Sequence, residues 1–291
     1  MTVIIDEAEQ PYSIRKAVHA FGTLPGSFSL AVYLLMQNAT SSSITKTSNC
    51  AFQVKRLLSV AAVEQATRAA AHAYSAEWNE SEELPDFDSL SIASILVSIY
   101  LNRRINRMTD SSEWAFISPL YYRDILASGL AIQSLYKSGL GIAVLGTSAI
   151  YSAIAALCAI DKKAFKEYRR CRKQEGFFIN SKLEQEIFGC STISIAKEVV
   201  QGLRFGSKIV EGFVYGFDLS IKDSVLPADA RPFRTVVKLL TTIHDKKKPD
   251  TPFDASMLGL DPRTTSVISN IISTEHQTSW LNGDITHQLY N

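Results

Sequence analysis

The stretch from Ser138 to Ile160 constrains the fold of this chain most, because it contains no charged side chain. It is long enough to span a lipid bilayer, and in a soluble protein it would have to lie in the core. Gly139, Gly141 and Gly146 interrupt its first half, so only Ala149–Ile160 reads as an unbroken apolar helix, of the length of a core helix. Aromatic girdles are missing. We therefore predict a buried central helix over Ala149–Ile160 and no membrane span.

The glycine-containing half also has the G-x-x-x-x-G frame of a phosphate-binding loop, from Gly141 to Gly146. A P-loop needs a lysine next to reach the β- and γ-phosphates, and Thr147 stands there instead. No βαβ pattern precedes the loop. We predict no bound nucleotide or other cofactor here, but a glycine turn with Thr147 or Ser148 as the N-cap of the following helix.

The composition is that of a globular protein with a substantial core: 46% of the 291 residues are hydrophobic, 20% are charged, and the formal net charge is +1. This balance excludes disorder and a general attraction to polyanions, so we expect no nucleic-acid partner. Basic clusters at Arg103–Arg107, Arg169–Lys173 and Lys246–Lys248 suit solvated helix ends.

Four scattered cysteines without C-x-x-C spacing and an N-terminus without a basic, apolar leader favour reduced thiols and a cytoplasmic location. The cysteines are Cys50, Cys158, Cys171 and Cys190.

Helical spacing dominates the rest of the chain, and alternating strand-like runs are few. The sequence therefore predicts an all-α, multi-helix bundle. Besides the central helix, the predicted helices are Ser13–Phe21, Ser27–Gln37, a short one from Ile44, Phe52–Tyr74, Ser89–Arg107, Leu120–Tyr136, Lys162–Lys173, Ser181–Phe188, Ser194–Leu203, Ser207–Gly216, Phe233–His244 and Thr264–Glu275.

Polar segments separate the predicted helices. Asn38–Ser43 and the acidic Asn79–Asp88 are predicted loops, and Pro227 and Pro232 mark a turn region. The polar stretch Met108–Glu113 is the best internal boundary. It divides an N-terminal helical subdomain, 13–110, from a second helical subdomain, 111–280, which together form one domain.

Five histidines, His19, His72, His244, His276 and His287, leave the interval from Ala73 to Ile243 without any. His244-Asp245 is the single His-Asp dipeptide, the pair that metal phosphohydrolases of the HD type use as adjacent ligands. It precedes Lys246, Lys247 and Lys248, whose charges would repel a metal ion. We predict a solvated His244 at a frayed helix end and no metal site. No serine lies in a G-x-S-x-G elbow, so catalysis has no positive signal.

Several short motifs follow one another along the chain. In the first half they are Leu24-Pro25, Leu34-Leu35, Ile44 and Val54–Ser59; in the second half they are Leu120–Asp124, Glu184–Cys190 and Ile209–Glu211. In this order they resemble the HDOD family of signalling domains. Leu120–Asp124 looks like the family's W-x-H-S helix start, and Glu184–Cys190 looks like its E-x-x-x-F-G segment. The resemblance implies an HD-like helical subdomain in the second half and a regulatory role in bacteria without enzymatic activity.

The departures from the family pattern fall at the metal-binding positions. Arg123, Thr192 and Gly216 stand where the resemblance leads us to expect histidine, and the His-Asp position falls between Thr147 and Tyr151, where neither residue occurs. None of these side chains can replace a histidine ligand. The candidate residues of a vestigial cleft are therefore Arg123, Asp124, Thr147, Ser148, Thr192 and Gly216.

Three functions remain open at this point. The first is a signalling or scaffolding module that binds a protein partner through its helical surface. The second is a divergent phosphohydrolase that uses Asp124 and Glu184 with a hard cation such as magnesium. The third is a sensor whose cleft holds a small anion or nucleotide beside Arg123.

Overall fold

The computed structural model describes residues 21, 25–40, 56–57, 59–75, 87–175, 178–244, 258–273 and 279–284, and these contain helices and no strand. The all-α prediction is confirmed. In chain order the elements are α2 (Gly26–Thr40), α4 (Ala61–Tyr74), α5 (Ser89–Met108), α6 (Ser111–Leu135), α7 (Gly139–Ile160), α8 (Lys162–Glu175), α9 (Ser181–Phe188), α10 (Thr192–Gly202), α11 (Ser207–Phe217), the 3-10 turns η2 (Asp223–Val225) and η3 (Ala228–Ala230), α12 (Arg231–His244), α13 (Pro262–Ser273) and the 3-10 turn η5 (Trp280–Asn282).

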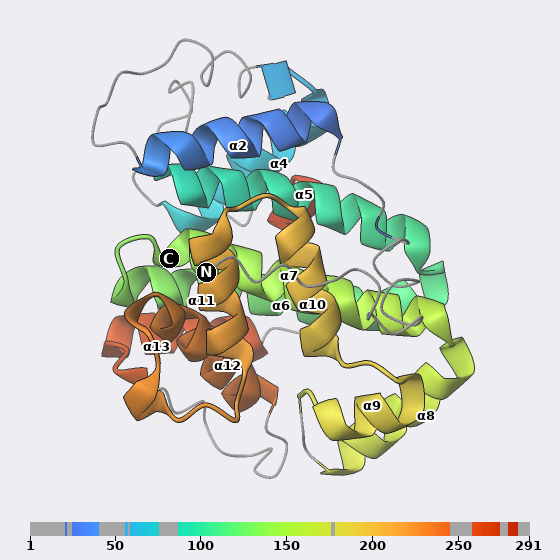
Figure 1. Cartoon of the computed structure of the whole chain (residues 1–291). Coiled ribbons are helices and arrows are strands. Elements are labelled where there is room, and N and C mark those ends of the chain that lie inside the picture. The colour runs from blue at the N-terminus through green and yellow to red at the C-terminus, as the bar shows by residue number, and fades with distance from the viewer. Residues whose placement is uncertain are drawn as a thin grey trace.

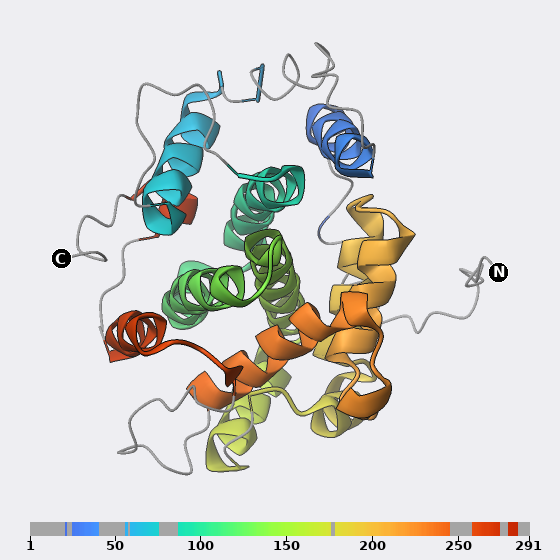
Figure 2. The ribbon, with the colours of Figure 1, turned by 90° about the vertical axis from the view of Figure 1, so that its left-hand side faces the viewer.

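Helix α7 is the centre of the bundle. It packs against α5 and α6 most extensively, and also against α10 and α12 (Figures 1 and 2). Within the described part of the chain, it is the single helix that is apolar and long enough to cross a membrane. Of its most apolar 18-residue stretch, 89% is buried inside the protein. Its surroundings are those of a core helix. Buried apolar residues from both predicted subdomains join one continuous core around it.

The central helix begins earlier than predicted, at Gly139 and not at Ala149. The prediction of a glycine turn was wrong, because the glycines serve close packing between helices. A Cβ on Gly141 would lie 2.8 Å from the backbone nitrogen of Ser91 on α5. Thr147 and Ser148 are therefore buried in the middle of α7 and do not cap its start.

The predicted break at Met108–Glu113 shrinks to the turn at Thr109 and Asp110. The Asp110 side chain accepts a hydrogen bond from the Glu113 backbone amide at 3.1 Å, which caps α6 and starts it at Ser111, well before the predicted Leu120. Pro119 lies inside this helix. Proline lowers helix propensity locally, but it did not end the helix here.

Most other predicted helices agree closely with the structure, and Ser181–Phe188 agrees at both ends. The loop prediction for Asn38–Ser43 was wrong for residues 38–40, which extend α2. Pro232 lies in the first turn of α12 and not in the preceding turn region. The predicted helices at 13–20 and from Ile44, and most of the loop at 79–88, lie outside the described residues.

The segment around η5 packs on α4, although the two are far apart in the sequence. The Trp280 indole is buried and donates a hydrogen bond to the Tyr74 hydroxyl at 3.0 Å. Tyr74 in turn donates to the backbone carbonyl of Ile125 on α6 at 2.8 Å. Helix α4 is thus held between the end of the described chain and α6.

The close approach of α5 and α7 at Gly141 can be tested by adding one methyl group. We expect Gly141→Ala to lower the free energy of unfolding by about 1–3 kcal/mol, because the new Cβ would overlap the α5 backbone. Gly202→Ala is the matched control, since a Cβ there meets no atom within 4 Å. Urea unfolding of both variants decides the matter, and equal stabilities would contradict the packing described.

Candidate functional site

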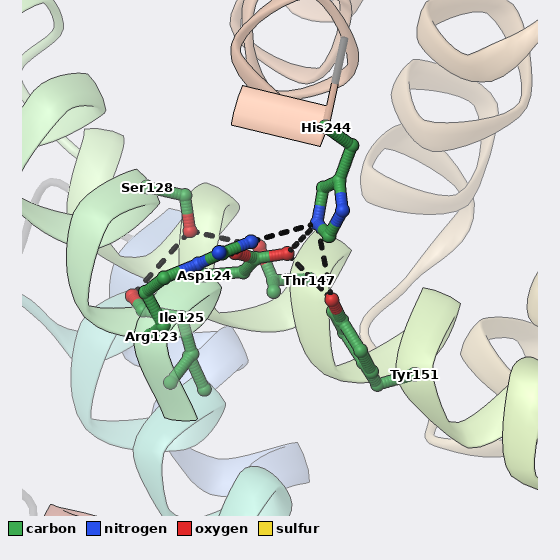
Figure 3. Close-up of polar contacts among 7 residues, drawn as sticks. All are labelled: Arg123, Asp124, Ile125, Ser128, Thr147, Tyr151 and His244. Atoms are coloured by element: carbon green, nitrogen blue, oxygen red, sulfur yellow. Dashed lines mark hydrogen bonds and ion pairs between the residues drawn. The ribbon is translucent and has the colours of Figure 1, made fainter. Parts of the chain in front are cut away.

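A buried group of polar and aromatic side chains joins α6, α7 and α12 (Figure 3). Arg123 and Asp124 come from α6, Tyr151 comes from α7, and His244 is the last residue of α12. Phe178, in the connection between α8 and α9, stacks on the imidazole with ring centroids 4.2 Å apart. We call these five residues the Asp124 cluster.

Asp124 is fully buried, and each of its carboxylate oxygens accepts hydrogen bonds. The Arg123 guanidinium donates a hydrogen bond to Oδ1 through Nε at 2.9 Å, and its Nη2 lies 2.8 Å from the same oxygen in an ion pair. Oδ2 accepts from the Tyr151 hydroxyl and lies 2.5 Å from His244 Nε2. A contact this short between a carboxylate oxygen and an imidazole nitrogen needs a proton between them, so His244 carries its proton on Nε2.

The electrostatic balance of the cluster favours an ionised carboxylate. Burial alone would raise the pKa of Asp124, but the neighbouring charges of His244 and Arg123, with hydrogen bonds from His244 and Tyr151, hold the pKa below its ordinary value of 3.8. Burial likewise opposes the charge of Arg123, yet the attraction of Asp124 raises the pKa of this guanidinium. The pair therefore stays charged inside the protein.

A second polar network continues from the cluster into the core. The ring of Tyr151 stacks on Tyr121, with centroids 5.0 Å apart. The Tyr121 hydroxyl donates to Ser148 at 3.0 Å, and Ser148 shares a 2.7 Å hydrogen bond with Ser98 on α5. Burial raises the pKa of the Tyr121 phenol, so this hydroxyl keeps its proton. The network supplies partners for hydroxyl groups within the α5–α6–α7 core.

The six residues predicted for a vestigial cleft do not all meet. Arg123 and Asp124 form part of the cluster, and Thr147 shares a 2.8 Å hydrogen bond with Ser128 of α6 (Figure 3). Thr192 lies elsewhere, with its backbone amide and hydroxyl donating to the buried Glu184 carboxylate at 2.6 and 2.8 Å.

Gly216 provides the close contact of α11 with η3 and α12, where a Cβ would lie 2.8 Å from the Ala230 carbonyl oxygen and 3.0 Å from the Arg234 backbone nitrogen. The set thus divides among separate contacts. It does not line one cavity.

The prediction of a solvated His244 was wrong, because its side chain is only 9% exposed and binds Asp124. The sequence contained a signal for this. His244 continues the helical spacing of Phe233, Val237 and Leu240, which are all buried on α12. Asp245 and Lys246–Lys248 lie outside the described residues.

The space beside the cluster is small. A pocket between α6, α7 and α8 borders it through Tyr151 and Phe178, with a volume of about 20 Å³. This is enough for about one water molecule. Among the described residues, no group of three or more His, Cys, Asp or Glu side chains is arranged to hold a metal ion. Chemically, the side chains of the cluster neutralise one another's charges and hold one another in position.

The paired charges give Asp124 a definite effect on stability. Its pKa is lowered by folding, so its contribution is present above the ordinary value of 3.8 and is lost as the pH falls through the lower folded value. We expect Asp124→Asn to cost about 3–5 kcal/mol at neutral pH, because Arg123 and His244 lose their partner. Urea unfolding measures this loss of stability, and the loss should be smaller at acidic pH than at neutral pH.

The exposed Asp229→Asn, whose side chain is 61% exposed, is the control and should change stability by less than about 0.5 kcal/mol. An Asp124→Asn variant as stable as this control would contradict the role given to the carboxylate.

In comparisons with known proteins, no family model, no curated protein and no solved structure matches the chain.

Proposed function

We propose that this chain is a non-enzymatic regulatory module of bacterial signal transduction, similar to HDOD domains, that acts in the cytoplasm by binding a protein partner. The observation that carries the proposal is the state of Asp124. It lies in the helix segment that resembles the W-x-H-S start, and its two oxygens accept from Arg123, Tyr151 and His244. A carboxylate used in this way stabilises the fold and has little capacity left for a metal ion.

The divergent phosphohydrolase is supported less well. Its two carboxylates, Asp124 and Glu184, are both fully buried and use both oxygens for hydrogen bonds within the protein. Their partners belong to different helices: α6, α7 and α12 for Asp124, and α8 and α10 for Glu184. Two carboxylates that bridge a hard cation need free oxygens directed at one point. This geometry therefore favours a structural use of both.

The small-anion sensor also lacks a favouring observation. Arg123 is the cation that would attract the anion, but its Nε and Nη2 already face the Asp124 carboxylate. Thr192 is held by a second carboxylate, Glu184. An anion at either position would face a buried negative charge, which disfavours binding.

A surface for the protein partner is supported by exposed apolar side chains near the end of α11. Tyr215, Leu219 and Val225 are all exposed, Leu219 at 65% and Val225 at 72%. They lie close together in the sequence, on α11 and the turns that follow it. A contiguous exposed apolar surface is typical of interaction sites, so this short segment is the surface that we assign to the partner.

The absence of catalysis can be tested directly. We expect the purified protein to hydrolyse no phosphodiester, cyclic dinucleotides included, with Mg²⁺, Mn²⁺ or Zn²⁺, and to retain less than one transition metal per chain in elemental analysis. An active phosphodiesterase serves as the positive control. Metal-dependent turnover would contradict the proposal and favour the divergent phosphohydrolase.

The partner surface can be tested with a double variant, Leu219→Asp with Val225→Asp. Chemical cross-linking in bacterial cells followed by mass spectrometry should capture a protein with the wild type and lose it with the double variant. Leu30→Asp is the matched control, because Leu30 is also exposed but lies on α2. Capture that is the same for all three proteins would exclude this surface.

A further inference from the structure

One side chain in the last turn of α12 makes polar contacts with two neighbouring helices, beside the apolar packing of Leu240 and Ile243 on the core. The imidazole of His244 contacts α6 through Asp124 and Arg123, and it contacts α7 through Tyr151, at Nε2 distances of 2.5, 3.1 and 3.5 Å (Figure 3). Phe178 covers one face of the ring, with the two planes 18° apart. Packing along α12 fixes its course, and His244 closes its last turn onto the core.

Among the described residues, the charged and titratable groups in contact with this imidazole include Arg123 and Asp124 from α6 and Tyr151 from α7. Near neutral pH the first two keep their charges, since the pKa of Asp124 is lowered and that of Arg123 is raised. Tyrosine phenols ordinarily ionise well above neutral pH. Histidine is the side chain whose charge ordinarily changes in this range.

The distances also indicate whether protonation of His244 strengthens or weakens its contact with α6. A protonated imidazole attracts the Asp124 carboxylate across 2.5 Å, and it is repelled by the guanidinium nitrogen of Arg123 across 3.1 Å. The attraction acts over the shorter distance. The opposing charge is spread over the whole guanidinium and is partly balanced by Oδ1 of Asp124. A neutral imidazole would keep the Nε2 hydrogen bond and lose its charge assistance, which roughly halves its strength.

We propose that His244 is a charge-dependent latch. With both ring nitrogens protonated, the positively charged imidazole holds the C-terminal turn of α12 closed over Asp124 and Tyr151. Loss of the second proton removes the charge, keeps the Nε2 proton, and loosens the turn. The latch is a conformational device that goes beyond the proposed function and does not depend on it. Closure of α12 can be observed whether or not a protein partner exists.

The test follows the imidazole and the helix in the same sample. Carbon-13 NMR of labelled histidine gives the protonation of His244 between pH 5.5 and 9, and hydrogen exchange gives protection factors for the amides of Leu240–Ile243. We expect protection of these amides to fall about tenfold as His244 loses its proton, the effect of replacing a charge-assisted hydrogen bond by a neutral one. Amides near Val236, earlier in α12, should keep their protection.

Two variants separate the latch from other effects of pH. His244→Gln keeps an N–H donor without a charge, so its last turn should have the low protection at every pH. His72→Gln is the matched control, because His72 also lies in the last turn of a helix, α4, and this variant should behave like the wild type. If His244→Gln does not fold, the comparison of Leu240–Ile243 with Val236 in the wild type still decides.

Three results would overturn the latch. One is a His244 signal that shows no change of protonation between pH 5.5 and 9. Another is protection of Leu240–Ile243 that stays constant, or rises, while His244 loses its proton. The last is the same tenfold fall in His244→Gln as in the wild type, which would assign the change to another group.

Discussion

The rest of this structure depends on the burial of α7. A helix without charged side chains gains little from contact with water, so α5, α6, α10 and α12 enclose it. Gly141 lets α5 approach to backbone distance, and buried polar groups of the helix are stabilised by partners inside the protein. Among the described residues, the buried Ser152 hydroxyl is an exception without a hydrogen-bond partner. Ser148 and Tyr151 have such partners in Tyr121 and Asp124. The cluster is thus partly a consequence of enclosing the central helix.

The second constraint is the negative charge of Asp124, which is buried when α7 is enclosed. A buried carboxylate is tolerated when cations and donors surround it, and Asp124 obtains both from its neighbour Arg123 and from the distant His244. This requirement joins α6 to the end of α12, across most of the described chain. The groups that a hydrolase would direct at a substrate are directed at each other, which is why a regulatory role is the better supported proposal.

Helical periodicity and capping residues predicted most of the fold, because each acts within a few neighbouring residues. The prediction failed at Gly139–Ser148 and at Ser111–Leu120, where glycine and proline indicated breaks but contacts between helices decided the outcome. For the site, the resemblance proposed one cleft for Arg123, Asp124, Thr192 and Gly216. The structure brings the first two together and places the other two in separate contacts, which short motifs could not predict. His244 was misjudged because the lysines after it suggested solvent, although its spacing from Leu240 indicated the core.

The hydrogen bonds from Trp280 to Tyr74 and from Tyr74 to Ile125 have a consequence for the order of folding. Helix α4 leaves the ribosome before η5, yet among the described elements its packing is more extensive with η5 than with α5 or α6. Contacts between such distant segments form only after the intervening chain has been synthesised. During synthesis, therefore, α4 lacks the packing partner that covers it most among the described elements until Trp280 emerges.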